Sequence, residues 1–163
     1  MSWNTCDLYD DFEGEAQVPD VVLSDFGGVT AFSGPITTVK AFEDNSRLKE
    51  LSATPGEGRV MVVDGGGSLR CALLGDMIGA DLVKNGWAGV VIYGCIRDVE
   101  ALEGLDLGVK ALASTPRKSV RRGEGQIDLP LTFGGVTWRA GDVLFADADG
   151  ILVLSPELAA GVS

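Results

Sequence analysis

Three charged side chains, Asp76, Arg97 and Asp98, carry the chemistry that this sequence offers most clearly. An arginine can bind a carboxylate through two parallel hydrogen bonds and can stabilise the negative charge of an enolate. A carboxylate beside it can hold a hard divalent cation through oxygen. Together these groups could support enolate chemistry on a small carboxylate without any histidine.

The chain contains no histidine among its 163 residues. Imidazole is the usual general base near neutral pH and the commonest zinc ligand, so its absence excludes Ser-His-Asp and Cys-His catalysis and His-containing zinc sites within one chain. Cys6, Cys71 and Cys95 form no C-x-x-C pair, which favours buried thiols over a disulfide framework or a zinc site.

The formal net charge is −11, from 13 Lys and Arg against 24 Asp and Glu. This balance argues against direct nucleic-acid binding, which needs basic side chains. A basic protein partner or a cation fits better, and a passive solvated surface is the alternative. No basic segment followed by an apolar run opens the chain, and no apolar stretch approaches the ~20 residues of a membrane span. We therefore expect one globular domain, cytoplasmic and without a membrane segment.

Alternating β and α segments must position the charged residues. Two apolar runs, 59–64 and 88–93, are typical of parallel strands buried on both faces. A helix is expected from Asp76 to Asn85, and another begins at Arg97. Ligands of open α/β sheets bind at the carboxyl ends of the strands, so Asp76 and Arg97, with twenty residues between them, should meet at one crevice.

The remaining pattern predicts a β-rich layer beside these helix-covered parallel strands. We expect an opening helix capped by Thr5, a turn at 24–29, a strand at 36–42, a helix capped by Asn45 or Ser46, a helical stretch at 68–74, a break in the strand at Gly94, a strand at 109–113, a hairpin at 131–138, strands at 142–146 and 150–154, and a helix from Pro156.

Each candidate also has a plainer structural interpretation. Asp76 alone could be only a helix N-cap, and Arg97-Asp98 only an ion-paired helix start. The triple glycine at 65–67 lacks the lysine and spacing of a phosphate-binding loop and is typical of a turn. Lys84 and Lys110 could in principle form a Schiff base, but solvated side chains are favoured. The pairing of Asp76 with Arg97-Asp98 makes a site the better interpretation.

The motifs that surround these residues resemble a known family. They are Asp25-Phe-Gly-Gly, Thr38-Val-Lys-Ala-Phe-Glu-Asp-Asn, Val63-Asp-Gly-Gly-Gly-Ser-Leu-Arg, Asn85-Gly-Trp-Ala-Gly, Phe133-Gly-Gly-Val-Thr and Ala146-Asp-Ala-Asp-Gly-Ile. The likeness, over nearly the whole chain, is to the family of the regulator of ribonuclease E activity A, which includes class II 4-hydroxy-4-methyl-2-oxoglutarate aldolases. It implies one α/β domain over residues 1–163 of the swivelling β/β/α type, assembled as a homotrimer or a dimer of trimers with sites at subunit boundaries.

The resemblance also implies a role for each site residue. Arg97 would bind the substrate and stabilise the enolate, Asp98 would ligate Mg²⁺ or Mn²⁺, and Asp76 would position a water for proton transfer. The pyruvyl carboxylate and keto group of a small 2-keto acid would be held by backbone N–H groups of Gly75, Asp76, Met77 and Ile78.

The family implies two functions. The first is metal-dependent cleavage of 4-hydroxy-4-methyl-2-oxoglutarate to two pyruvates, with decarboxylation of oxaloacetate through the same enolate. The alternative is a non-catalytic regulator that binds and inhibits ribonuclease E. Asp76, Arg97 and Asp98 favour the enzyme, whereas Ala101, where the longer aldolases carry a carboxylate, and the end of the chain at Ser163 resemble the regulator branch.

Overall fold

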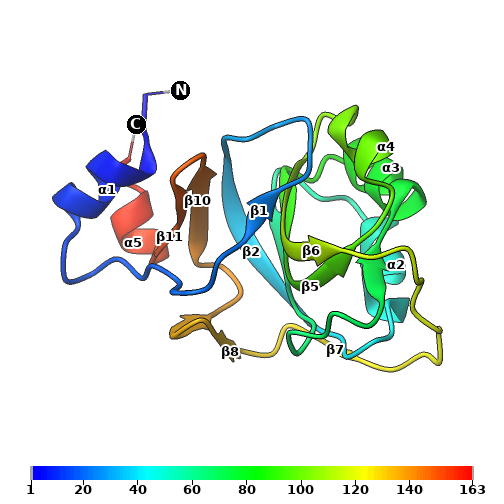
Figure 1. Ribbon diagram of the computed structural model, residues 1–163. Coiled ribbons are helices and arrows are strands. Elements are labelled where there is room, and N and C mark those ends of the chain that lie inside the picture. The colour runs from blue at the N-terminus through cyan, green and yellow to red at the C-terminus, as the bar shows by residue number, and fades with distance from the viewer. Residues whose placement is uncertain (1, 163) are drawn as a thin grey trace.

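A nine-stranded curled sheet dominates the computed structural model, which describes residues 2–162 (Figure 1). Its strand order is β1-β6-β5-β3-β2-β10-β11, with β4 beside β5 and β7 beside β2, and β8 and β9 form a separate pair. The strands are β1 (Ser24–Asp25), β2 (Phe32–Lys40), β3 (Val60–Asp64), β4 (Ala72–Leu74), β5 (Gly89–Ile96), β6 (Gly108–Ser114), β7 (Gln126–Ile127), β8 (Leu131–Phe133), β9 (Val136–Trp138), β10 (Val143–Asp147) and β11 (Gly150–Leu154). The helices are α1 (Thr5–Asp11), α2 (Ser46–Ser52), α3 (Asp76–Lys84), α4 (Val99–Glu103) and α5 (Pro156–Ala159).

The parallel core consists of β2, β3, β5 and β6. Strands β3 and β5 are buried along almost their whole length, as their continuous apolar sequences predict. Helices α2, α3 and α4 lie together on one side of these strands (Figure 1). Their contribution to that core includes Leu48, Leu82 and Leu102, each without solvent exposure.

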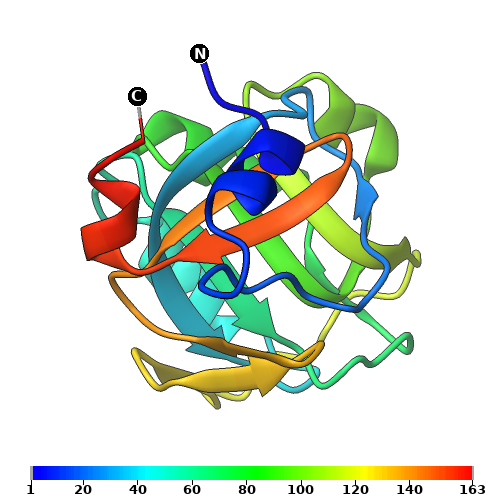
Figure 2. The same cartoon turned by 90° about the vertical axis from the view of Figure 1, so that its left-hand side faces the viewer.

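Strand β2 joins the two halves of the sheet, because it pairs parallel with β3 and antiparallel with β10. The β10–β11 hairpin and the β8–β9 pair enclose a second core in which the Phe133 ring stacks on Tyr93 at 4.8 Å and on Trp138 at 4.7 Å. Helices α1 and α5 lie against the outer side of β10 and β11 (Figure 2). The predicted α/β class, with a parallel core and a β-rich second layer, is confirmed.

Two predictions near the site, for residues 68–74 and for Gly94, are wrong. Residues 68–74 form no helix: after a loop they form β4, which pairs parallel with β5. The three residues of β4 are all buried, which fits a strand covered on both faces and does not fit an exposed helix. Gly94 does not end β5, because a register shift between Ile92 and Cys95 lets the strand continue to Ile96.

Smaller corrections concern the first residues and the turns. The N-cap of α1 is Asn4, whose side chain accepts the N–H of Asp7, whereas the Thr5 hydroxyl donates to Asp147 at 2.6 Å. The segment 24–29, predicted as a turn, begins with the short edge strand β1. The triple glycine forms the predicted turn, with positive φ at Gly66 and Gly67.

Candidate functional site

The β4–α3–β5 unit brings the three charged candidates together. Leu74 at the end of β4 is the register partner of Ile96 at the end of β5, and its carbonyl accepts the N–H of Arg97 at 2.9 Å. The chain segments leaving these two strand ends therefore start side by side. One enters α3 at Asp76, and the other carries Arg97 and Asp98 into α4. The twenty intervening residues form α3 and β5, which explains the spacing in the sequence.

Asp98 lies over the first turn of α3. Its Oδ2 accepts the backbone N–H of Asp76 at 2.9 Å and lies 3.9 Å from Nε of Arg97. This geometry depends on a left-handed backbone at Asp98, with φ 59° and ψ 48°, which aspartate tolerates better than most residues. The Asp98 carboxylate thus lies at the positive end of the α3 dipole.

Gly75 allows this close approach. A Cβ at position 75 would lie 2.7 Å from Oδ2 of Asp98 and 3.4 Å from Cγ of Arg97. Its backbone is extended, with φ −136°, so the requirement for glycine comes from the neighbouring side chains and not from the backbone conformation.

All of the residues predicted for the site line one cavity of about 460 Å³. They are Gly75, Asp76, Met77, Ile78, Arg97 and Asp98. Met77 is exposed and the Ile78 side chain is buried in the core, so Ile78 can offer a ligand only its backbone. The N–H groups of the first turn have no intrahelical acceptor, which leaves those of Met77 and Ile78 suited to an anion.

A second part of the lining of this cavity, called here the Arg121 wall, was not predicted. It contains Asn45 and the segment Lys118 to Arg121. Nε of Arg121 donates to Oδ1 of Asn45 at 2.9 Å, and Nδ2 of Asn45 donates to the Leu73 carbonyl at 3.1 Å. The contact between Arg121 and Asn45 spans 76 positions, so no local motif could have indicated it.

Asp44 stabilises the segment next to this wall through hydrogen bonds. Its side chain is almost fully buried and accepts hydrogen bonds from Ser46 and from the backbone N–H groups of Arg122 and Glu124. Burial opposes ionisation of the Asp44 carboxyl, but these hydrogen bonds outweigh it and lower its pKa to about 2. The carboxylate therefore stays charged and ties the start of α2 to residues 122–124.

The acidic groups of the cavity fit a weakly ligated cation. Within residues 2–162, no group of three His, Cys, Asp or Glu side chains could hold a metal ion. Asp98 uses Oδ2 for the Asp76 N–H, and across the same residues no donor contacts its Oδ1. One carboxylate oxygen completed by waters suits Mg²⁺, which dehydrates reluctantly, so the hard-oxygen donor fits the expected metal.

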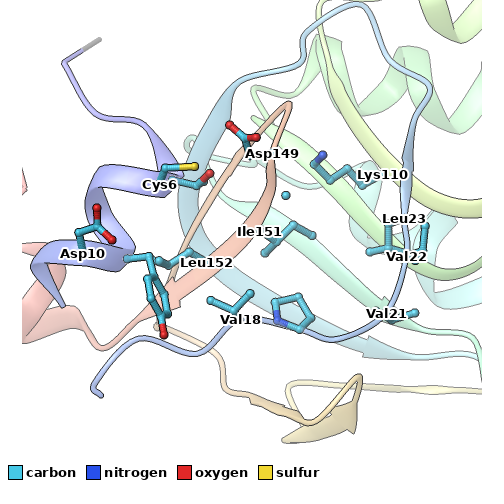
Figure 3. Close-up of a pocket in the computed structure, with 14 residues that line it drawn as sticks. Cys6, Asp10, Val18, Val21, Val22, Leu23, Lys110, Asp149, Ile151 and Leu152 are labelled. Atoms are coloured by element: carbon cyan, nitrogen blue, oxygen red, sulfur yellow. The ribbon is translucent and has the colours of Figure 1, made fainter. Parts of the chain in front are cut away.

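A second cavity, of about 710 Å³, lies among α1, the segment 18–23 and β11 (Figure 3). The prediction that Lys110 is solvated is wrong. Its Nζ is buried in this wall, where it donates to the Asp147 carbonyl at 2.9 Å and pairs with Asp25 at 3.0 Å. These partners satisfy the buried ammonium group, so it offers no free charge to a substrate carboxylate. Lys84 is exposed, as predicted.

Cys6 also borders the second cavity, and the prediction of three buried thiols fails there, because Cys6 is exposed while Cys71 and Cys95 are buried. A hydrogen bond to Asp149 and the charges of Asp149, Asp147 and Asp10 raise the pKa of the Cys6 thiol. The neutral thiol and the acidic surroundings do not match an anion-binding reaction centre.

Comparison with known proteins gives the class of the chain. The sequence model of the family described as Aldolase/RraA matches residues 4–153. The chain therefore belongs to the Aldolase/RraA family, as the sequence motifs predicted.

Individual relatives carry different names. A protein of Alkalilimnicola ehrlichii named "Putative 4-hydroxy-4-methyl-2-oxoglutarate aldolase" is 59% identical over 94% of this chain and 95% of its own length. One of Xanthomonas campestris with the same name is 56% identical over 97% and 95%. A crystal structure titled S-adenosylmethionine: 2-dimethylmenaquinone methyltransferase, from Geobacillus kaustophilus, superposes with a TM-score of 0.95, at 44% identity over 99% of this chain and all of the other.

The RNA-processing inhibitor RraA of Thermus thermophilus superposes with a TM-score of 0.91, at 42% identity over 96% of this chain and 94% of the other. The names of these relatives thus include an aldolase, a methyltransferase and an inhibitor, and they do not define a single activity for the family. None of the helices in residues 2–162 has the length and apolar character to cross a membrane.

Proposed function

We propose that this protein is a divalent-metal-assisted carbon–carbon lyase that cleaves 4-hydroxy-4-methyl-2-oxoglutarate to two pyruvates and decarboxylates oxaloacetate. One observation carries the proposal: Arg97, Asp98 and the first turn of α3 converge on a single cavity. The names of the relatives at 56–59% identity support the aldolase.

Binding of the 2-keto acid follows from the wall formed by α3. The substrate carboxylate accepts hydrogen bonds from the backbone N–H groups of Met77 and Ile78 at the positive end of the helix. The Arg97 guanidinium donates to the keto oxygen, where negative charge develops during the reaction. Arg97 is held for this task by its contact with Asp98 and by donation from Nη1 to the Pro116 carbonyl at 3.3 Å.

Both substrates converge on one enolate. In the aldol substrate the C3–C4 bond breaks, its electron pair forms the pyruvate enolate, and the C4 hydroxyl loses its proton as the second pyruvate forms. In oxaloacetate the C3–C4 bond breaks with loss of CO₂ and leaves the same enolate. Asp76, exposed at the cavity rim, holds a water that takes up the hydroxyl proton and returns a proton to C3.

Asp98 is the residue that would hold Mg²⁺ or Mn²⁺. When bound, such an ion supplies Lewis acidity to the keto oxygen and shares the enolate charge with Arg97. The free Oδ1 of Asp98 and its place beside Arg97 support this assignment.

The test is pyruvate release from both substrates, with Mg²⁺ or with EDTA, for the wild type and for Asp98→Asn. Asparagine tolerates the left-handed backbone and can still accept the Asp76 N–H, so the variant removes charge with little change of geometry. We expect a loss of at least about 100-fold in kcat. Asp106→Asn, an exposed carboxylate, is the control. Rates that survive both EDTA and Asp98→Asn contradict the proposal.

A second candidate function is inhibition of ribonuclease E. It is supported by the 42% identity to the RNA-processing inhibitor and by the net charge of −11, which suits a basic protein surface. An RNA-cleavage assay with purified ribonuclease E tests it. The Asp98→Asn variant should inhibit the ribonuclease as strongly as the wild type does, because binding to a protein partner does not depend on catalysis. The homotrimer and the cytoplasmic location remain predictions, the first of which sedimentation can test.

A further inference from the structure

The site cavity has an unusual charge for this protein. Three cationic side chains line it, those of Arg97, Lys118 and Arg121, against two carboxylates, Asp76 and Asp98. The chain as a whole has 24 acidic and 13 basic side chains. A cavity with an excess of positive charge inside a strongly acidic protein is suited to a ligand with more than one negative charge.

Arg97 and Arg121 come from different segments of the chain and have different neighbours. Arg97 lies beside the first turn of α3 and shares the Asp98 carboxylate. Arg121 is held through Nε by Asn45, and within residues 2–162 no carboxylate pairs with it. Its two terminal nitrogens are therefore available for a second carboxylate, which arginine can bind through two parallel hydrogen bonds.

Asn45 gives the Arg121 side chain a defined position. Asn45 is almost fully buried, and its Nδ2 is already committed to the Leu73 carbonyl. That bond fixes Oδ1 toward the cavity side, where it accepts Nε of Arg121. The guanidinium is thus oriented before any ligand arrives, which lowers the conformational entropy lost on binding.

Ser119 supplies an independent observation on this wall. It is 7% exposed, and its hydroxyl is the only buried side-chain polar atom without a hydrogen-bond partner within residues 2–162. Ser119 lines the same cavity as Arg121. Buried polar atoms almost always have a partner, so this unpaired hydroxyl is a group that a bound ligand, or a water held by one, can satisfy once the Ser119 side chain rotates toward it.

We propose that Arg121, held by Asn45 and flanked by Ser119, binds the second carboxylate of the substrate and makes the site selective for dicarboxylic over monocarboxylic 2-keto acids. This inference rests on the proposed function, since it assigns the first carboxylate to α3 and Arg97. It adds the residue that determines specificity.

The direct test is binding, which does not require turnover. Calorimetry in the presence of Mg²⁺ compares 2-oxoglutarate with 2-oxopentanoate, a pair that differs by a terminal carboxylate in place of a methyl group. The wild type should bind 2-oxoglutarate at least about tenfold more tightly. Arg121→Met should remove that preference while leaving the affinity for 2-oxopentanoate within about threefold, and Arg121→Lys should keep part of it.

Arg139→Met is the matched control, because it removes the same charge from an exposed arginine that does not line the cavity. It should keep the preference. Equal affinity of the wild type for the two ligands, or an equal loss of both in Arg121→Met, overturns the proposal, since a merely structural role would weaken both.

Kinetics separates this proposal from the proposed function. If the wild type prefers 2-oxoglutarate but releases no pyruvate from any substrate, the lyase fails and the dicarboxylate site stands. If the lyase is active, Arg121→Met should lower kcat/KM about tenfold for 4-hydroxy-4-methyl-2-oxoglutarate and leave it within about threefold for the monocarboxylic 4-hydroxy-2-oxopentanoate. A similar loss for both substrates contradicts the role of Arg121.

Discussion

Asp98 combines two demands at a single position. Its backbone must adopt the left-handed conformation, and its carboxylate must reach the Asp76 N–H. Residues held in such sparsely populated conformations gather at functional sites, where the surrounding structure maintains them. Asparagine also tolerates the left-handed backbone but carries no charge. The Asp98→Asn variant therefore tests the effect of the charge on activity with little effect on the fold.

Ser119 offers a prediction at the same scale. Because its buried hydroxyl has no partner in residues 2–162, Ser119→Ala removes a desolvated polar group without breaking a hydrogen bond. We expect the free energy of unfolding to be unchanged or to rise by up to about 1 kcal/mol in urea titrations without ligand. The same variant should gain less thermal stability from 2-oxoglutarate than the wild type does. Clear destabilisation without ligand would mean that the hydroxyl is already satisfied.

The sequence indicated only one side of the site. Asp76, Arg97 and Asp98 could be predicted because their spacing follows the path of one βαβ unit. Asn45, Ser119 and Arg121 could not, because their proximity depends on tertiary contacts between distant segments. The left-handed backbone at Asp98 also has no local signal, since aspartate occupies ordinary helix starts equally well.

At the scale of elements, the short strand β4 determines where the site forms. The sequence of residues 68–74 was predicted as helix, yet β4 provides the register that sets Gly75 beside Arg97. A three-residue strand is too short to show an alternating pattern, so its burial between neighbours decides its structure. The elements β3 and α3 were predicted correctly from their apolar patterns, and β5 was predicted as a strand, but only as far as Tyr93.

Asp44 connects α2 to the Arg121 wall, and it makes that connection sensitive to acid. Its folded pKa of about 2 lies below the ordinary value of 3.8, so its stabilising effect is present above pH 3.8 and is lost as the pH falls toward 2. Asp44→Asn should lower the free energy of unfolding by about 2 kcal/mol near neutral pH, from the charge-assisted hydrogen bonds it loses.

Urea titrations at a series of pH values check this. The difference in stability between the wild type and Asp44→Asn should shrink as the pH falls below about 4. A difference that stays constant down to about pH 2 would show that the Asp44 charge is not what holds residues 122–124.

At the scale of the whole molecule, Lys110 binds three regions together. Its ammonium group lies on β6, pairs with Asp25 of β1 and donates to the Asp147 carbonyl in the β10–β11 hairpin. The sequence alone favoured a solvated lysine, because its partners, Asp25 and Asp147, are distant from Lys110 in the sequence and only the fold brings them close. The Lys110 ammonium group therefore links β1 and β6 to the β10–β11 hairpin.

Asp25→Ala tests this link. The variant leaves the buried Lys110 ammonium with the Asp147 carbonyl but without its counterion. Because the Asp25 side chain is itself 32% exposed, we expect about 2 kcal/mol less stability in urea unfolding. Glu15→Ala removes an equal charge from the exposed surface and should change stability by less than about 0.5 kcal/mol. Equal effects of the two variants would rule out a special contribution of the Lys110–Asp25 pair.

The hydrogen bonds that complete the two walls of the site close chain loops of very different length. The bond from Asp76 to Asp98 joins residues 22 positions apart, whereas that from Arg121 to Asn45 joins residues 76 apart. Loop-closure entropy makes the longer connection about 1 kcal/mol more costly to form. During folding, therefore, the wall that carries Arg97 should assemble first and the wall that carries Arg121 later. On the proposed function, a partly folded molecule would then form the groups that bind the keto group before it forms the arginine that distinguishes dicarboxylic from monocarboxylic substrates.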